Sequence, residues 1–225
     1  MIIEKKSSFF NLKNVNLNER QERIFGSLQN YLEMSHIYRS AMSELGTKLE
    51  NLDEEFHVRF DRNPIHHMEA RLKSPQSIID KLAKKGKDIS MESAKANISD
   101  IAGIRVICYY IQDIYSIVDL LSVRDDINLI NIADYIKEPK PSGYRSLHMD
   151  VSVPVVLSDK TEHVPVEIQV RTIAMDFWAS VEHQLRYKSP DAVPVSLRAQ
   201  LKDIAQTIAD TDVKMEEIYA KLEEL

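Results

Sequence analysis

The sequence predicts an α/β (α+β) fold, in which one α/β core carries long helical extensions at its N- and C-terminal ends. Residues 20–60 and 197–225 place apolar side chains at alternating steps of three and four, a spacing typical of helices. The region between them contains short apolar runs and segments of strict apolar–polar alternation, which are typical of strands. With 225 residues, 44% of them hydrophobic and 28% charged, the chain supports one sizeable core, and wholesale disorder is excluded.

The N-terminal extension keeps a 3.5-residue apolar repeat over residues 20–60. This repeat predicts one long helix, or two helices with a break near Gly46. The apolar face packs either against another helix or on the protein's own core, and the pattern leaves both open. Its positions are Ile24, Leu28, Tyr31, Tyr38, Met42, Leu45, Leu49, Leu52 and Phe56, with Ser35 filling one slot.

The C-terminal extension repeats the same steps after Pro194, and Ser196 is placed to cap the helix that begins there. Two narrow apolar faces favour packing of the extensions on each other or between subunits, while packing on the protein's own core remains the alternative. The positions are Leu197, Leu201, Ile204, Ile208, Thr211, Met215, Ile218, Leu222 and Leu225.

The middle region alternates predicted helices and strands. Residues 75–85 and 114–122 are amphipathic and residues 173–187 close the region, so all three are predicted helices. The β-branched and aromatic run 103–111 predicts a buried strand, and residues 127–132 a shorter one. Strict alternation in 147–153 and 164–171 predicts two neighbouring strands that form a hairpin around residues 157–163.

Composition excludes several classes of protein. The five glycines are too scattered for a dinucleotide fingerprint or a Walker phosphate loop, so side chains must bind any phosphates. The single Cys108 excludes an internal disulfide and is expected to be a buried apolar side chain in a cytoplasmic protein. No segment resembles a membrane span or signal peptide, and the net charge of −6 argues against a general nucleic-acid coat, so neither a membrane nor a stable nucleic-acid partner is expected.

Two acidic residues stand at strand positions suited to metal chemistry. The alternation of residues 164–171 puts Glu167, Gln169 and Arg171 on one face of the sheet. Asp100 lies just before the buried strand, with Arg105 following. Carboxylates on neighbouring strands commonly hold Mg²⁺ against nucleotide phosphates. The alternative for each residue is an ordinary solvated side chain.

Two basic clusters supply charges that phosphates require. The loop 137–148 presents Lys137, Lys140, Arg145 and His148 around the ring of Tyr144. Such a loop suits phosphates and a stacked purine, and an exposed turn is its alternative. A second cluster contains Arg71, Lys73, Ser77 and Lys81, where Ser74 is placed to cap the helix that Pro75 begins. A solvated helix start is the alternative here.

Other conspicuous side chains favour structural roles. His66 and His67 lack further ligands at zinc-site spacing. Trp178 and Phe177 are expected in the core of their helix. Glu182 and His183 either line an acceptor pocket or pack ordinarily.

Taken in order, four segments resemble one family: RLKSPQSI, DIAGIRVIC, YIKEPKPSGYRSLH and VEIQVRTIAMDFWASVEH. They resemble the synthetase domain of the RelA/SpoT family, the enzymes of the stringent response that make the alarmones ppGpp and pppGpp. The resemblance covers about residues 66–188. Without a hydrolase or regulatory domain in the sequence, the chain looks like a stand-alone small alarmone synthetase, most like the RelP type and next the RelQ type. The expected divisions are an N-terminal helical region (1–62), a synthetase domain (63–190) and a C-terminal oligomerisation helix (191–225).

The resemblance implies a mixed β-sheet of nucleotidyltransferase type flanked by helices. It implies a GTP diphosphokinase that transfers pyrophosphate from ATP to the 3′-hydroxyl of GDP or GTP, releasing AMP. Asp100 and Glu167 would hold Mg²⁺, Glu167 would accept the hydroxyl proton, and Tyr144 would stack on guanine. The implied ATP ligands are Arg71, Lys73, Ser77, Lys81 and Arg105, and the implied acceptor ligands are Lys140, Arg145, His148 and Gln169. A homotetramer built from the terminal helices is also implied.

Two rival functions remain. One is a toxic relative that shares the donor site but pyrophosphorylates transfer RNA or makes adenosine alarmones. The other is a catalytically silent regulator that binds nucleotide or single-stranded RNA through its helical faces. The joint presence of donor, metal and acceptor groups argues against the silent protein.

Overall fold

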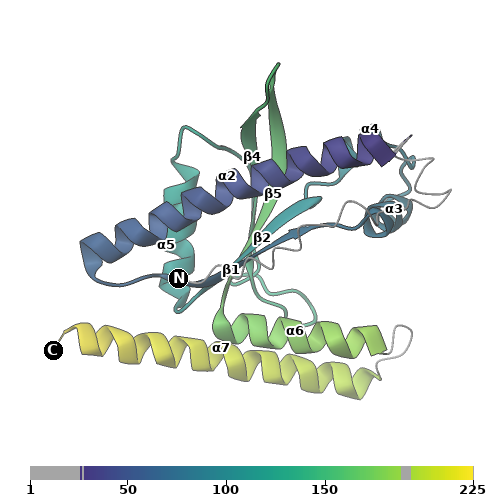
Figure 1. Cartoon of the computed structure of the whole chain (residues 1–225). Coiled ribbons are helices and arrows are strands. Elements are labelled where there is room, and N and C mark those ends of the chain that lie inside the picture. Colours follow the sequence, from purple (N-terminus) through teal and green to yellow (C-terminus); the bar gives the residue numbers. More distant parts are fainter. Residues whose placement is uncertain (1–25, 27, 189–193, 225) are drawn as a thin grey trace.

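The computed structural model describes residue 26 and residues 28–188 and 194–224 (Figure 1). Within these residues one mixed sheet has the strand order β1-β2-β5-β4-β3. β2 runs parallel to β5 and the other neighbours are antiparallel, so the predicted mixed sheet and the β4–β5 hairpin are confirmed. The strands are β1 (Ile65–Leu72), β2 (Ala102–Cys108), β3 (Asn128–Asp134), β4 (Leu147–Val156) and β5 (Thr161–Thr172).

Helices cover the sheet and extend beyond it (Figure 1). α2 crosses one face, while α6 and α7 lie side by side at one end of the sheet. In the described part of the chain, no helix is long and apolar enough to cross a membrane. The helices are α2 (Leu28–Phe60), α3 (Pro75–Lys84), α4 (Met91–Asn97), α5 (Ile111–Ser122), α6 (Ile173–Lys188) and α7 (Val195–Glu223).

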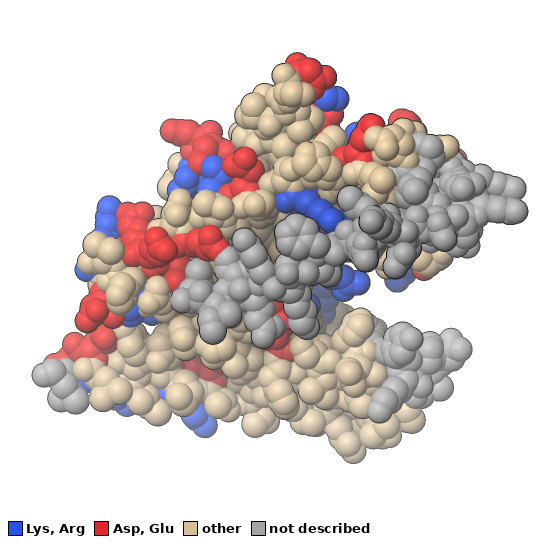
Figure 2. All heavy atoms as spheres, viewed as in Figure 1, with Lys and Arg blue, Asp and Glu red and all other residues tan. Residues whose placement is uncertain are grey.

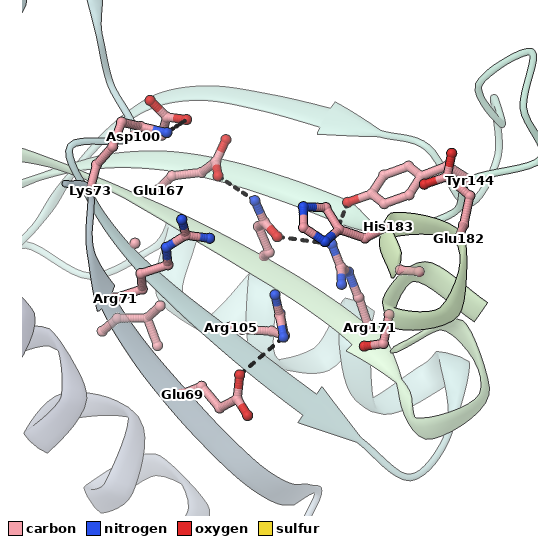
Figure 3. A pocket seen from close by; sticks show the side chains of 15 residues that line it. Glu69, Arg71, Lys73, Asp100, Arg105, Tyr144, Glu167, Arg171, Glu182 and His183 are labelled. Carbon is pink, nitrogen blue, oxygen red and sulfur yellow. Dashed lines mark hydrogen bonds and ion pairs between the residues drawn. The ribbon is translucent and has the colours of Figure 1, made fainter. Parts of the chain in front are cut away.

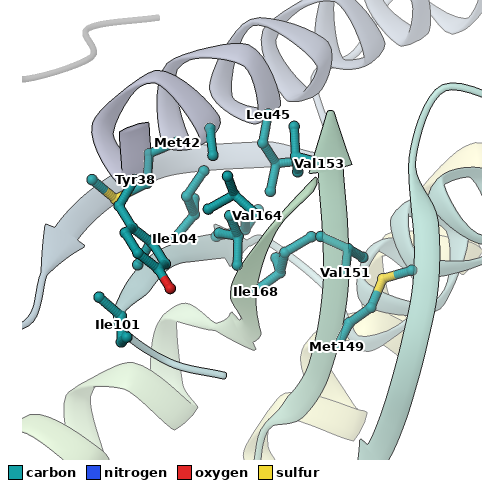
Figure 4. Close-up of a cluster of buried hydrophobic side chains, with 14 of the residues drawn as sticks. Tyr38, Met42, Leu45, Ile101, Ile104, Met149, Val151, Val153, Val164 and Ile168 are labelled. Carbon is teal, nitrogen blue, oxygen red and sulfur yellow. The ribbon is translucent and has the colours of Figure 1, made fainter. Parts of the chain in front are cut away.

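The apolar face of α2 packs on the protein's own sheet, which decides between the two alternatives for the N-terminal extension. Tyr38, Met42 and Leu45 lie against the inner residues of β2, β4 and β5, such as Val153 and Val164 (Figure 4). α2 is one continuous helix through Gly46, without the suggested break. The predicted position Ile24 lies outside the described residues.

Two elements, β1 and α4, were missed by the sequence analysis, and the end of the predicted strand 103–111 shifted. β1 is an edge strand with a bulge after Ile65, and its mostly exposed, polar pattern lacks strict alternation. α4 has only seven residues and is capped by Ser90. β2 ends at Cys108 rather than residue 111, because Tyr110 already caps α5. The predicted buried thiol of Cys108 is confirmed, and burial raises its pKa.

α7 uses only part of its apolar repeat within the protomer. Ala205 is buried against Trp178 and Ala179 of α6, with Leu201 and Ile208 packed beside them. Trp178 and its helix therefore form a core contact, as predicted, whereas Phe177 is exposed, contrary to its predicted core position. The predicted cap Ser196 is wrong, because α7 begins at Val195 and Pro194 occupies the cap position without a side-chain bond. Leu225 lies outside the described residues.

A buried hydrogen-bond chain fixes α7 to the end of β5. The hydroxyl of Thr172 donates to Asp212 of α7 at 2.6 Å and accepts from the backbone N–H of Met175 in α6 at 3.1 Å. Asp212 is 8% exposed, and burial together with the charge of Glu216 raises its pKa despite the Thr172 bond. The ionised carboxylate therefore destabilises the folded protein.

Asp212→Asn is expected to raise the melting temperature at neutral pH by about 2–4 °C, because the amide oxygen still accepts from Thr172 while the buried charge is removed. Because the pKa of Asp212 is raised in the folded protein, this destabilisation appears as the pH rises through the pKa that Asp212 has in the folded state. The gain should therefore vanish near pH 4 and below, where Asp is also protonated when unfolded. Calorimetry across pH measures this, with the exposed Asp203→Asn on the same helix as control. A lower melting temperature at neutral pH would contradict the argument.

Candidate active site

A cavity of about 480 Å³ opens over β1, β2 and β5 and is walled by α6 (Figure 3). Figure 2 shows the surface hollowed between the α6–α7 pair and the rest of the molecule, with Lys and Arg atoms visible at this hollow. The cavity is lined by Glu69, Arg71, Lys73, Asp100, Gly103, Ile104, Arg105, Tyr144, Glu167, Gln169, Arg171, Ala179, Ser180, Glu182 and His183.

Strand register brings these side chains into two rows across the sheet. Arg71 of β1 pairs with Gly103 of β2, which pairs with Glu167 of β5. One step along, Glu69 pairs with Arg105, and Arg105 with Gln169. Since Gly103 has no side chain, it leaves the floor of the cavity open between Arg71 and Glu167.

The basic cluster at the start of α3 meets Asp100. Lys73 lies 3.1 Å and Lys81 2.8 Å from one oxygen of Asp100. Ser74 caps α3 as predicted, accepting from the N–H of Ser77. The hydroxyl of Ser77 bonds to Ser74 at 2.9 Å, and neither Ser77 nor Lys81 lines the cavity.

Arg105 is held between two acidic side chains. Its Nη1 donates to Glu69 at 3.0 Å, and its Nε lies 3.6 Å from Asp176 of α6. Arg71 projects into the cavity on the neighbouring strand (Figure 3). The two arginines thus flank one end of the cavity, where the sequence analysis expected the donor nucleotide.

The two carboxylates expected to bind metal face the same cavity. Burial raises the pKa of Glu167, but the hydrogen bonds from His148 and Gln169 outweigh it, so the pKa is lowered overall. Burial likewise raises the pKa of Asp100, and Lys81 and Lys73 reverse this. The negative charge of Asp100 partly opposes the lowering of the Glu167 pKa. With lowered pKa values, both carboxylates are ionised at neutral pH.

This pair fits Mg²⁺ in its donor chemistry. Oδ1 of Asp100 is buried without a hydrogen-bond partner, so one carboxylate oxygen remains for a cation. Among the described residues no group of three or more His, Cys, Asp or Glu side chains could hold an ion. An Mg²⁺ ion held by these two carboxylates therefore needs phosphate oxygens to complete its coordination shell, as is usual at nucleotide sites.

Tyr144 and its neighbours form the other end of the site. The tyrosine hydroxyl lies 2.8 Å from Nε2 of His148 and accepts from Nη2 of Arg171 at 2.6 Å. Nζ of Lys140 lies 4.7 Å from the Tyr144 ring centroid, and burial lowers the pKa of Lys140. Nδ1 of His148 lies 3.3 Å from Glu167, so this contact joins a residue predicted to bind the acceptor to a carboxylate predicted to bind metal.

The structure places Arg145 away from the cavity. Its guanidinium donates to the carbonyl of Ala205 at 3.2 Å and to the side chain of Gln206 at 2.9 Å, both in α7. The loop approaches α7 closely at Gly143, which has a φ of 92°, and a Cβ there would lie 2.6 Å from that of Ala205. Arg145 thus fastens the loop to α7.

The lining residue Arg171 and two nearby carboxylates, Asp176 and Asp150, were given no site role in the sequence analysis. Arg171 shares the sheet face of Glu167 and Gln169, so strand parity could have assigned it. Asp176 binds Arg171 and Arg105 from α6, which no local pattern signals. Asp150 pairs with Glu167 in register, and burial and that neighbour's charge raise its pKa. Glu182 and His183 do line the cavity.

Comparison with known proteins identifies the class to which this fold and site belong. Residues 70–192 match the family described as the region found in RelA / SpoT proteins, and the chain belongs to this family. It is 44% identical to "GTP pyrophosphokinase YwaC" of Bacillus subtilis over 179 residues, which cover 80% of this chain and 85% of that protein.

Solved structures of small alarmone synthetases agree with the fold. Small alarmone synthetase 1 of Bacillus subtilis bound to its product pppGpp superposes with a TM-score of 0.79 at 34% identity, covering 86% of this chain and 98% of that one. The same enzyme bound to AMPCPP gives a TM-score of 0.75 at 30% identity, covering 88% of this chain and 100% of that one. The predicted family and fold class are therefore confirmed.

Proposed function

We propose that the protein is a (p)ppGpp synthetase, a GTP pyrophosphokinase that transfers pyrophosphate from ATP to the 3′-hydroxyl of GDP or GTP and releases AMP. The observation that carries the proposal is the pair of ionised carboxylates, Asp100 and Glu167, between a cationic wall and a tyrosine-bearing loop. The name of YwaC and the nucleotides in the two synthetase 1 structures support it.

In the proposed reaction, the 3′-oxygen of the acceptor attacks the β-phosphorus of ATP. The bond from that phosphorus to the oxygen bridging the α-phosphate breaks, and AMP leaves with the bridging oxygen. The hydroxyl proton passes to Glu167, which is ionised and therefore able to accept it. Arg71, Lys73 and Arg105 would bind the donor, and their positive charges would stabilise the transition state by position and electrostatics.

Asp100 and Glu167 would hold Mg²⁺ together with the phosphate oxygens. When bound, the ion supplies positive charge where the phosphates gather negative charge. Lys73 and Lys81 hold the second oxygen of Asp100, so they would orient this carboxylate toward the phosphates.

On the acceptor side, Tyr144 would stack on guanine, while Lys140, His148 and Gln169 would contact the ribose or phosphates. Arg145 would contribute only by holding the loop against α7. An acceptor panel tests the proposal: purified protein with ATP and Mg²⁺ receives GDP, GTP, ADP or transfer RNA, and products are separated chromatographically. Product from GDP or GTP alone supports the proposal. Product from ADP or transfer RNA alone would favour the toxic relative, and none at all would favour the silent regulator.

Tyr144→Ala is expected to raise the Michaelis constant for GDP by about 5- to 150-fold, which corresponds to stacking of about 1–3 kcal/mol. The constant for ATP should change far less, because Tyr144 lies at the opposite end of the site from Arg71 (Figure 3). Steady-state kinetics with each substrate varied in turn measure both values. Tyr109→Ala, on an exposed ring outside the cavity, is the control. Equal effects on both substrates would show that Tyr144 does not bind the acceptor base.

We also propose that the protein forms a homo-oligomer, and the family resemblance implies that this is a tetramer. Apolar side chains of α7 that do not face α6 are exposed in the protomer, namely Leu197, Ile204, Met215, Ile218 and Leu222. The outward side of the α6–α7 pair shows few charged atoms in Figure 2. A second copy would bury these side chains.

Ile218→Lys combined with Leu222→Lys is expected to reduce the mass measured by light scattering, because a subunit contact would bury the new charges. The protomer should keep its fold, since both positions are exposed. Leu201→Lys should instead lower the melting temperature, because Leu201 packs against α6. Unchanged mass in the double variant would remove this face from the proposed interface.

Both substrates are cytoplasmic nucleotides, so we place the protein in the cytoplasm, as a source of alarmone in the stringent response. Residues 63–190 would form the synthetase domain, with the terminal regions 1–62 and 191–225 completing it and supporting assembly. The RelP type remains the predicted subtype.

A further inference from the structure

Five polar side chains at the Tyr144 end of the cavity form a closed ring of contacts, and one of them, His148, lies just outside the cavity lining. Nη2 of Arg171 donates to Oε1 of Gln169 at 2.9 Å and to the hydroxyl of Tyr144 at 2.6 Å. Gln169 donates onward to Glu167, which lies 3.3 Å from Nδ1 of His148. Nε2 of His148 closes the ring at 2.8 Å from the Tyr144 hydroxyl.

Arg171 is the fixed member of this ring. It is 5% exposed, and its remaining nitrogens are bonded on the side away from the ring. Nη1 donates to Asp176 at 3.0 Å, and Nε donates to the buried hydroxyl of Ser146 at 3.4 Å. A guanidinium is a planar fork with fixed donor directions, so these two bonds set where Nη2 points.

The donor character of Arg171 determines how the other polar groups are oriented. Because Arg171 only donates, the Tyr144 oxygen must accept, which leaves the tyrosine hydrogen for Nε2 of His148. The histidine tautomer with its proton on Nδ1 then donates to Glu167, and every partner is satisfied. By the same reasoning, the Gln169 oxygen faces Arg171, so its amide nitrogen faces Glu167.

We propose that Arg171 is a positioning residue that aligns the acceptor with the catalytic carboxylate, an inference that rests on the proposed function. It acts on the acceptor base through the Tyr144 hydroxyl and on Glu167 through the Gln169 amide. One buried guanidinium thereby couples the residue that holds the acceptor to the residue that accepts its proton. Its centre lies 5.1 Å from the Tyr144 ring centroid, so it also supports the ring from its face.

Kinetics of Arg171→Met and Arg171→Lys test the assignment. Both variants are expected to raise the Michaelis constant for GDP about 10-fold and to lower kcat about 10-fold. The Michaelis constant for ATP should change less than about 2-fold. Lysine keeps the charge beside Asp176 and should recover the melting temperature, but not the GDP constant, because it lacks the fork. If Arg171 served only to neutralise Asp176, lysine would restore both. Arg124→Met, which breaks a surface pair with Asp126, is the control.

A double-mutant cycle with Tyr144→Phe separates positioning from direct binding. Phenylalanine keeps the ring and removes the hydroxyl, so in this background Arg171→Met should raise the GDP constant by less than about 2-fold. If the effects of the two substitutions on the GDP constant multiply in full, the inference is overturned, because Arg171 would then contact the acceptor independently of Tyr144. If the methionine variant does not fold, Arg171→Lys replaces it in the cycle. A wild-type protein that forms no product from GDP and ATP would instead contradict the proposed function.

Discussion

Glu167→Gln and Asp100→Asn are each expected to abolish pyrophosphate transfer while the protein remains folded. Each substitution keeps the size of the side chain and removes one of the two ionised carboxylates in the cavity. Loss of such a group removes several kcal/mol of transition-state stabilisation, so kcat should fall by about 100-fold or more. Product formation with saturating ATP, GDP and Mg²⁺ measures the effect.

The matched control for this prediction lies on the same strand. Glu162→Gln removes a carboxylate of β5 that pairs with Lys160 outside the cavity, and its activity should stay close to that of the wild type. Melting temperatures of all three variants establish that the fold persists. Turnover within about 10-fold of the wild type in Glu167→Gln or Asp100→Asn would contradict the assigned role of that carboxylate.

Among the proposed substitutions, Leu45→Ala is expected to cause the largest loss of stability. Leu45 is fully buried where α2 packs on the sheet (Figure 4). Truncating a buried leucine costs about 2–5 kcal/mol, since transfer energy is lost and a cavity remains. For a chain of this size, the melting temperature should therefore fall by about 4–20 °C.

Leu120→Ala is the control, because Leu120 is half-exposed on α5 and should change the melting temperature little. Calorimetry of both variants also tests where the N-terminal apolar repeat packs. If Leu45→Ala left the protomer's stability unchanged, α2 would not be part of the protomer's core.

Alternation and amphipathic spacing predicted the central elements because burial there follows a simple period. β4 and β5 alternate regularly between buried and half-buried residues along most of their length, and both were predicted with their hairpin. β1 was not predicted, because an edge strand buries few side chains and its sequence therefore shows little periodicity. The 3.5-residue repeat over residues 20–60 predicted one long helix or two, and the structure shows one over Leu28–Phe60. A repeat alone does not specify what its apolar face packs against, which here is the sheet.

For the site, the sequence predicted which residue types would gather, and tertiary contacts determined which of them meet. Strand parity correctly placed Glu167, Gln169 and Arg171 on one face. The loop residue Arg145 has no such constraint, and its contact with α7 spans about 60 positions of the chain. The partners supplied by α6, such as Asp176, depend on how a helix docks after the strand, which local sequence does not encode.

The proposed pyrophosphate transfer is tested most directly by the identity and ratio of the products formed from ATP and GDP. Wild-type protein is incubated with both nucleotides and Mg²⁺, and all nucleotides are separated and quantified. We expect AMP and a guanosine product bearing a new 3′-pyrophosphate in equal amounts, with no product when Mg²⁺ is chelated. Formation of ADP with transfer of a single phosphate, or no consumption of GDP, would contradict it.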